Sequence, residues 1–252
     1  MTSVVASASH IAKTNPAAVK SYGKFLWMDP GEPAVIRQTL RVMLDVVKRY
    51  DVDGIHIDDY FYPYPENGPD SVAVPFPDSG SYARYLKSGG RLERDDWRRH
   101  NVDTLIQQIY VKTKALKPWV KVGVSPFGIG RPGMRPAGVA GFSQYDKLYA
   151  NVELWLARGW LDYLAPQLYW KIDPPQQSFP VLLDWWLAQN TRGRHVWPGL
   201  ATYRVFQANN PYPISEIENQ VRITRARTNG MLFYNTTATL SRNSGEMAAM
   251  LS

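Results

Sequence analysis

Short runs of β-branched and apolar residues alternate with longer segments of helical periodicity along almost the whole chain. In the helix predicted over residues 33–50, Ile36, Leu40, Met43 and Val47 fall on one face at steps of three and four residues. Repeats of strand and helix favour right-handed crossovers and a parallel sheet. Strands are predicted over residues 24–29, 52–58, 120–127, 161–170, 195–203 and 230–235, and helices over 33–50, 95–116, 146–160, 179–190 and 214–228.

This pattern predicts an α/β fold of the (β/α)8 TIM-barrel type that lacks its first one or two β/α units. Six strands are visible, whereas a closed barrel has eight and takes about 250 residues. The segment before Lys24 is too short for two more units. We therefore expect one catalytic domain over residues 1–252, truncated at its amino terminus, with an open doubly wound sheet as the alternative.

Polar residues gather at the carboxyl ends of several predicted strands, and this favours the barrel over the open sheet. In a barrel all these ends converge on one mouth, where the catalytic groups of such enzymes lie. We predict that Asp58 and Asp59 are catalytic and that the other members of the group bind substrate. The group consists of Asp29, Asp58, Asp59, Ser125, Gln167, Tyr169, Tyr203 and Asn235.

The stretch from Asp51 to Glu66, "DVDGIHIDDYFYPYPE", contains the most informative of these positions. Alternate side chains of a strand face opposite sides, so His56, Asp58 and Tyr60 share one side. The apolar side chains on the other side suit the layer between sheet and helices. His56 and Asp58 should then face the barrel interior, and we add His56 and Tyr60 to the predicted substrate-binding residues.

Asp59 begins the loop and can turn either towards the mouth or towards a neighbouring arginine. The structural alternative is that Asp58 and Asp59 cap a turn or form ion pairs. A metal site would need further ligands, and the other histidines, His10, His100 and His195, lie away from this strand end. We expect neither a metal nor another cofactor.

Residues 61–95 form a connection longer than barrel loops usually are, and loops of this length are often functional. Its prolines limit chain entropy, and its tyrosines offer flat faces, so we predict a wall on the catalytic face that includes Tyr62. The alternative is a surface elaboration. Trp170 is assigned to substrate binding with Tyr169, although packing at the rim is the simpler role.

The segment Gly128 to Gly133, "GIGRPG", matches a dinucleotide-binding fingerprint by spelling only. Pro132 and Pro136 prevent the immediate helix that would bind a pyrophosphate. A glycine-rich loop on the catalytic face, with Phe127 before it and Arg131 directed towards substrate, is the preferred interpretation, and a plain turn is the alternative.

The chain has a formal charge of +7, which favours an anionic partner. Its arginines and lysines are scattered, so nucleic-acid binding is not expected. No apolar run is long enough to span a bilayer, and the first residues have no signal-peptide pattern. A membrane contact would require an anchor outside this sequence, and we expect a monomer.

The segments "LWMDPG", "RYDVDGIHIDDYFYPYP", "GVSPFGIGRP" and "PQLYW" resemble the bacterial glycosyl hydrolase-like 10 family, in order, from about Ser9 to Asn235. Members resemble TIM-barrel glycosidases, and some are envelope lipoproteins that cleave peptidoglycan glycan strands already stripped of stem peptides. The resemblance implies a hydrolase of β-linked amino-sugar polymers in the cell envelope, with Asp58 and Asp59 as catalytic candidates. The family's first barrel strands and its export segment have no counterpart before Met1.

Glycoside cleavage needs an acid and a second carboxylate or substrate group on the other side of the anomeric carbon. Adjacent strand residues rarely supply both, so Asp29 and Asp173 are candidates for the second carboxylate. "DGIHIDDY" is also weakly similar to a chitinase pattern in which Asp58 would position the substrate acetamide, but Tyr60 stands where the acid would be. We predict Asp58 as the essential carboxylate and Asp59 as its partner. The alternative is a barrel that binds anionic glycans without cleaving them.

Overall fold

The structure is a computed structural model that describes residues 7–174 and 176–240. The amino-terminal part contains α1 (Ile11–Thr14), the 3-10 helix η1 (Pro16–Ala18), β1 (Val19–Tyr22), β2 (Phe25–Met28), α2 (Pro33–Arg49), β3 (Gly54–Ile57), α3 (Ser79–Lys87) and α4 (Arg94–Leu116). The remainder contains β4 (Lys121–Val124), α5 (Gln144–Lys147), α6 (Val152–Arg158), β5 (Tyr163–Leu164), α7 (Phe179–Gln189), β6 (His195–Val196), β7 (Gly199–Leu200), the 3-10 helix η2 (Thr202–Phe206), α8 (Ile214–Arg225), β8 (Leu232–Phe233) and α9 (Thr236–Leu240).

The central feature is a ladder of parallel strands. β3, β4, β5 and β6 pair in that order, and β7 pairs with β8, in every case in parallel. Gln167 bridges to Phe127 on one side and to Gly199 on the other, which links the two sheets. β6 and β7 are thus two pieces of the strand predicted over residues 195–203, and the strand ends follow one another along a single ladder.

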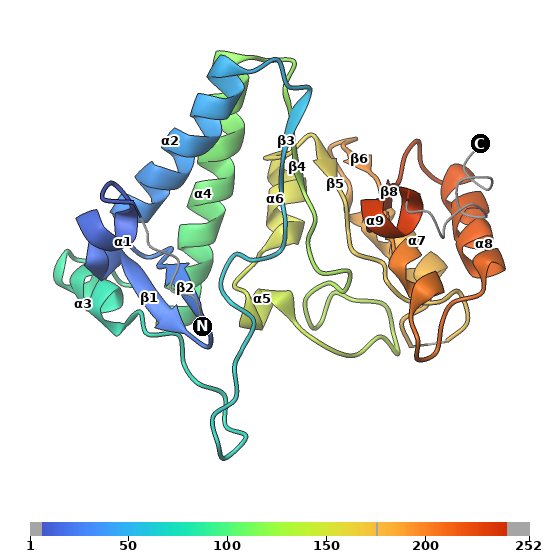
Figure 1. Cartoon of the computed structure of the whole chain (residues 1–252), viewed down its shortest axis with the longest axis horizontal. Coiled ribbons are helices and arrows are strands. Elements are labelled where there is room, and N and C mark those ends of the chain that lie inside the picture. The colour runs from blue at the N-terminus through green and yellow to red at the C-terminus, as the bar shows by residue number, and fades with distance from the viewer. Residues whose placement is uncertain (1–6, 175, 241–252) are drawn as a thin grey trace.

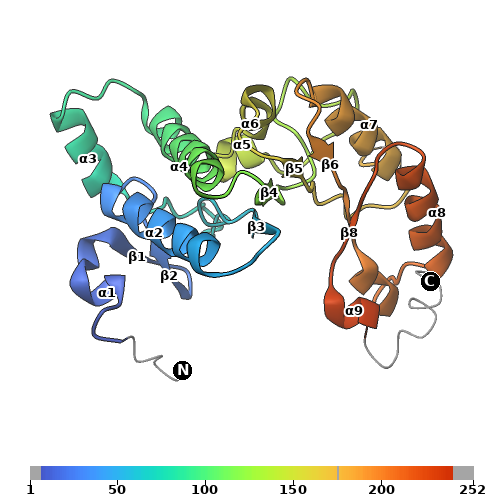
Figure 2. The ribbon, with the colours of Figure 1, turned by 90° about the horizontal axis from the view of Figure 1, so that it is seen from above.

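The helices and strands follow an arc (Figure 2) that is open between the β1–β2 hairpin and α9. Within residues 7–174 and 176–240, β3 and β8 are the ends of the ladder and do not pair with each other. The α/β class and the parallel sheet are confirmed, whereas a closed eight-stranded barrel remains a prediction. No helix in this described part of the chain is both long and apolar enough for a bilayer crossing.

The strand expected over residues 24–29 exists, but its place in the parallel sheet was predicted wrongly. β2 pairs with β1 in a separate antiparallel sheet, with Val19 opposite Met28 and Tyr22 opposite Phe25 (Figure 1). Gly23 has φ +55°, a left-handed conformation that allows the tight turn between the two strands. A local hairpin therefore replaces the expected first β/α unit.

Two apolar clusters hold the helices against the ladder. One lies between α2, α4 and the start of β3 and β4, and it contains Leu40, Val47, Ile55, Ile109, Val120 and Val122. Ile36 and Met43 pack against it, so the predicted helix face is confirmed. The larger cluster lies under α6, α7 and α8 and includes the fully buried Trp155 and Trp186.

Two helical segments differ from the prediction. The helix expected over residues 146–160 is divided into α5 and α6, because Tyr149 has φ +56° and cannot continue the helix. The long connection over residues 61–95 contains a helix of its own, α3, which packs against the amino-terminal part (Figure 1).

Candidate active site

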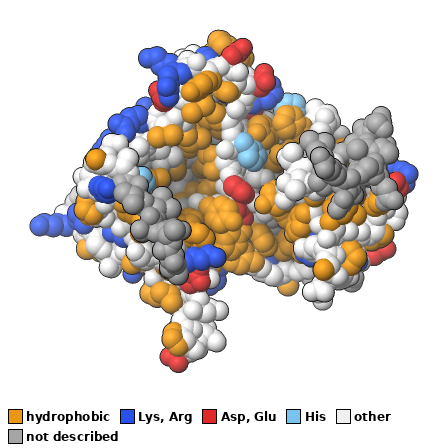
Figure 3. All heavy atoms as spheres, viewed as in Figure 1, with side chains coloured by type: hydrophobic (Ala, Val, Ile, Leu, Met, Phe, Trp, Pro, Cys, Tyr) orange, Lys and Arg blue, Asp and Glu red, His pale blue; other side chains and the backbone are white. Residues whose placement is uncertain are grey.

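A cavity of about 330 Å³ lies at the carboxyl ends of the parallel strands. It is lined by His56, Asp58, Asp59, Tyr60, Tyr64, Ser125, Gln167, Tyr169, Gly199, Leu232, Phe233 and Tyr234. Figure 3 shows an acidic group in the hollowed centre of this face, with hydrophobic side chains around it. The position agrees with the general rule that parallel α/β sheets bind ligands beyond the carboxyl ends of their strands.

Asp58 follows β3 directly and presents its carboxylate to the cavity. Its Oδ1 accepts hydrogen bonds from the Asp59 backbone N–H at 2.9 Å and from Gln167 Nε2 at 3.0 Å. Gln167 Nε2 also donates to the Ser125 carbonyl oxygen at 3.0 Å. Groups from the ends of β3, β4 and β5 are thus joined, and Gln167 fixes the orientation of a carboxylate that is open to solvent.

Asp59 lies beside Asp58 but is 3% exposed. Burial raises its pKa to about 6, and the Asp58 carboxylate adds to the increase. Tyr64 donates a hydrogen bond to Asp59 Oδ2 and opposes the increase. Two neighbouring residues of one type therefore differ in environment: one carboxylate faces the cavity, and the other is held in its wall and keeps a proton in mildly acidic solution.

His56 lies on the same face as Asp58, as the strand alternation predicts. Its Nδ1 is 2.9 Å from the Tyr163 hydroxyl, and its ring is stacked on that of Tyr163 with centroids 5.6 Å apart. Burial lowers the pKa of His56, against the opposing effect of Asp58. Gly123 makes this packing possible, since a Cβ there would lie 1.9 Å from the Tyr163 ring.

Two tyrosines, Tyr169 and Tyr234, line the cavity near the end of β8, and the predicted Tyr203 packs against both without lining it. Tyr169 and Tyr234 are stacked at 5.6 Å, and the Tyr203 ring meets both of them edge-on. Tyr60 is 60% exposed and also lines the cavity. Flat aromatic faces around a carboxylate pair are suited to binding sugar rings.

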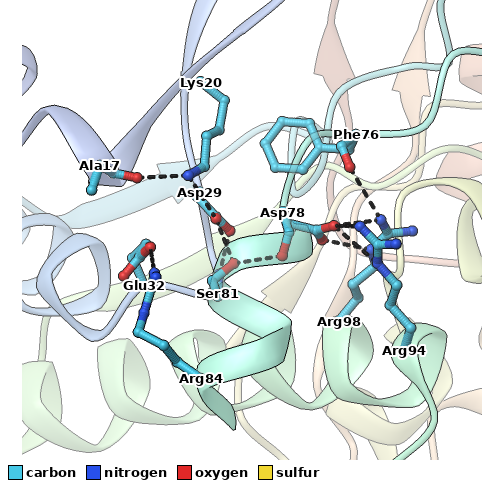
Figure 4. A network of polar contacts seen from close by, with 11 residues as sticks. Ala17, Lys20, Asp29, Glu32, Phe76, Asp78, Ser81, Arg84, Arg94 and Arg98 are labelled. Atoms are coloured by element: carbon cyan, nitrogen blue, oxygen red, sulfur yellow. Dashed lines mark hydrogen bonds and ion pairs between the residues drawn. The ribbon is translucent and has the colours of Figure 1, made fainter. Parts of the chain in front are cut away.

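Asp29 is not brought to this cavity. It is fully buried between β2 and α3, where it accepts from the Ser81 hydroxyl at 2.7 Å and from the Gly31 N–H at 2.9 Å (Figure 4). Burial raises its pKa. The same network contains Asp78 and Arg98, so the geometry gives Asp29 a structural environment.

Tyr62 is also away from the cavity, because its ring is 1% exposed and packs edge-on against Phe76 and Tyr149. Four other predicted residues do not line the cavity. Phe127 packs edge-on against Trp170, the Arg131 guanidinium lies over Tyr145, and Asn235 accepts from the Ala238 N–H. Asp173 is exposed and does not line the cavity either.

Sequence reasoning missed several lining residues: Tyr64, Gly199, Leu232, Phe233 and Tyr234. Tyr64 belongs to the same "YFYPYP" run as Tyr62, and its two flanking prolines were an available signal for a fixed extended segment. Within the described residues, 7–174 and 176–240, no cluster of three or more histidine or acidic side chains is arranged to hold a metal ion.

The cavity thus brings a carboxylate pair from one strand end together with several aromatic rings. The profile of the glycosyl hydrolase-like 10 family matches residues 3–214, and the chain belongs to this family. This confirms the resemblance predicted from the motifs, and it supports a glycoside hydrolase-type function.

Two relatives illustrate the relationship. The chain is 40% identical over 221 residues to the glycosyl hydrolase YngK of Bacillus subtilis, and the aligned region covers 86% of this chain and 42% of YngK. It is 34% identical over 200 residues to the glycosyl hydrolase DigH of Escherichia coli, and this aligned region covers 77% of this chain and 44% of DigH. The chain thus spans less than half the length of these relatives.

Among solved structures, bee venom hyaluronidase matches at 10% identity and a TM-score of 0.41, over 88% of this chain and 64% of that protein. A second structure of the same enzyme, in complex with a hyaluronic acid tetramer, matches at 9% identity and a TM-score of 0.38, over 88% of this chain and 93% of that one. Scores of this size do not establish a shared fold.

Proposed function

We propose that the chain is the catalytic part of a glycosidase that cleaves β-linked amino-sugar polymers, specifically peptidoglycan glycan strands without stem peptides. The observation that carries this proposal is the unequal carboxylate pair at the end of β3. Asp58 is open to the cavity, whereas Asp59 is buried with a pKa raised to about 6. Acid-assisted glycoside cleavage requires a carboxyl that holds a proton and a second group on the other side of the anomeric carbon, and the raised pKa of Asp59 makes it the proton-holding carboxyl of the pair.

Asp58 is assigned as the essential carboxylate that faces the sugar and stabilises the positive charge of the oxocarbenium-like transition state. Asp59 is its partner, which orients it and holds a proton. Among the described residues that line the cavity, the carboxylates are Asp58 and Asp59, both from one strand end. The group on the other face of the sugar would then come from the substrate, and the acetamide of an amino sugar can fill that role.

The charge of the chain supports an anionic polymer. Its formal +7 favours association with a strand in which each muramic acid bears a free carboxylate once the stem peptides are removed. This substrate places the protein in the cell envelope. The aromatic rings of Tyr60, Tyr169 and Tyr234 around the carboxylates supply faces for sugar rings. We also propose that the strands described here form part of a complete (β/α)8 barrel in the whole protein.

The second candidate is a protein that binds such glycans without cleaving them. The observation that favours it is the placement of both lining carboxylates on one strand end, because a glycosidase uses groups on both sides of the scissile bond. Binding needs the aromatic faces and a basic surface but no proton donor. The two candidates share a ligand and differ only in whether a glycosidic bond is broken.

The test is product analysis by mass spectrometry after incubation of the chain with denuded glycan strands. Asp58→Asn should lower product formation at least about 10²-fold, because it removes the negative charge that stabilises the transition state. Asp45→Asn on the surface of α2 is the matched control and should keep full activity. Asp59→Asn should lower activity as well.

Equal product from Asp58→Asn and Asp45→Asn would refute the site assignment. If the parent chain forms no product but is retained on a column of immobilised glycan, the binding function replaces the enzymatic one. If it neither cleaves nor binds denuded strands, the proposed substrate is wrong.

A further inference from the structure

The loop that follows β3 returns one tyrosine to the carboxylate pair. Tyr64 lies between Pro63 and Pro65, and its hydroxyl donates to Asp59 Oδ2. Its ring is stacked on Phe142 with centroids 5.1 Å apart and meets Tyr60 edge-on at 5.9 Å. The ring is therefore held on two sides, and the hydroxyl is aimed at the buried carboxyl.

The same loop is fastened at a second point, away from the cavity. The Tyr22 hydroxyl donates to the Val74 carbonyl oxygen at 2.7 Å and accepts from the Glu66 N–H at 3.0 Å. These bonds tie the loop to β1, 44 and 52 residues earlier in the chain. The loop thus has one contact that touches Asp59 and another that only keeps the loop in place, and the two can be removed separately.

We propose that Tyr64 is a positioning residue whose hydroxyl fixes the Asp59 carboxyl and sets the pH at which that carboxyl releases its proton. The consequence for catalysis rests on the proposed function, whereas the effect on Asp59 does not. Through this contact, the loop over residues 61–78 becomes part of the proton-holding machinery rather than only a wall of the cavity.

The charges around Asp59 give the direction of the effect. Burial and the neighbouring Asp58 raise the pKa of Asp59, and the Tyr64 hydrogen bond lowers it. Tyr60, in the loop after β3, and Tyr169, in the segment between β5 and α7, line the same cavity, and burial raises the pKa of each phenol, so both stay neutral. In the described part of the chain, no lysine or arginine forms an ion pair with Asp58 or Asp59.

Tyr64 itself remains a donor throughout the working range, because burial and Asp59 raise the pKa of its phenol. Its hydroxyl stabilises the ionised form of Asp59, since a hydrogen bond to a carboxylate favours the charged state. Loss of the hydroxyl should therefore raise the pKa of Asp59 above its present value of about 6.

The experiment measures the titration of Asp59 directly by carbon-detected NMR on the chain labelled with 13C at the aspartate carboxyls, with Asp59→Asn used to assign the signal. Tyr64→Phe keeps the ring and its stacking on Phe142 but removes the donor. The midpoint of Asp59 should rise by about one pH unit. Tyr64→Met, which also lacks a donor, should give a shift in the same direction and serves if the Phe variant does not fold.

Tyr22→Phe is the matched control, because it removes one hydroxyl of β1 that holds the same loop and does not contact Asp59. Its Asp59 midpoint should stay at that of the parent chain. An unchanged midpoint in folded Tyr64→Phe would overturn the proposal. An equal shift in Tyr22→Phe would overturn it too, since loop order rather than the hydroxyl would then set the pKa.

A second readout links the residue to catalysis. In glycan cleavage, the limb of the pH profile that reports Asp59 should move upwards in Tyr64→Phe by the amount seen in the NMR titration. A profile that stays fixed while the NMR midpoint moves would remove Asp59 from the rate-limiting proton transfer. Absence of cleavage in the parent chain would refute the proposed function and leave the NMR result standing.

Discussion

Asp78 is the centre of the network that joins the long loop to α4. Asp78→Asn should therefore lower the free energy of unfolding more than a substitution on the surface does. The Asp78 carboxylate is fully buried and accepts from Arg98 Nε at 2.7 Å, Arg98 Nη2 at 2.8 Å and Arg94 Nε at 3.1 Å (Figure 4). Arg98 is itself 6% exposed. An asparagine would keep the shape but leave the Arg98 guanidinium buried beside a neutral group.

Removal of one partner from a buried ion pair costs about 3–5 kcal/mol, because the remaining charge stays desolvated. We apply this cost only to the ion pair between Asp78 and Arg98. The Arg94 side chain is 35% exposed, and such a pair adds at most about 1 kcal/mol. Domains unfold with a free energy of about 5–15 kcal/mol, so the expected loss is a large share of the total.

The assay is urea unfolding followed by tryptophan fluorescence, with the free energy of unfolding extrapolated to water. Asp45→Asn is the matched control, since its pair with Arg49 on α2 is exposed and should be worth about 0.3–0.5 kcal/mol. A loss below about 1 kcal/mol for Asp78→Asn, close to that of the control, would show that water reaches Arg98 and would refute the reasoning.

Two further substitutions test other parts of the packing. Burial raises the pKa of Asp103 to about 6, so between about pH 4 and 6 the folded chain keeps a proton that the unfolded chain has lost. The free energy of unfolding is therefore highest below pH 4 and falls as the pH rises through 6. Asp103→Asn still accepts from Trp155 Nε1 and should gain about 1–2 kcal/mol over the parent chain at pH 7 but not at pH 4, as measured by urea unfolding; an equal effect at both pH values would contradict this. Gly123→Ala should cost about 1–3 kcal/mol and displace the Tyr163 ring, which the NMR signals of His56 would report. Gly80→Ala, where the nearest atom to the new Cβ is 3.6 Å away, should do neither.

The parts of the fold that follow from local periodicity could be predicted from the sequence. Alternation along β3 placed Ile55 in the layer against the helices and His56 and Asp58 on the other side, and the structure agrees. The pairing of β2 could not be predicted in this way. The pattern of its residues predicts one more apolar strand of the sheet. Only the left-handed turn at Gly23 and the preceding β1 direct β2 into a hairpin.

The candidate site was predictable where its residues end regular strands. Asp58, Asp59, Ser125, Gln167 and Tyr169 meet at the cavity because parallel strands end at the same edge. Asp29 follows a strand as well, but that strand belongs to the hairpin, so the same reasoning sent it to the wrong place. Tyr62 and Tyr64 could not be told apart, since the direction of a loop side chain depends on contacts far away in the sequence.

The surroundings of Asp59 include one of these distant contacts. A strand end can offer two adjacent carboxylates, but alternation only sends them to opposite sides and gives no reason for the raised pKa of Asp59. Burial raises the pKa of Asp59, and Tyr64, which lies on a loop that Tyr22 anchors, donates to the Asp59 carboxyl and lowers that pKa. The chemistry proposed here thus depends on the loop over residues 61–78 as well as on the strand, and a change that removes only the Tyr64 donor should raise the pKa of Asp59 further.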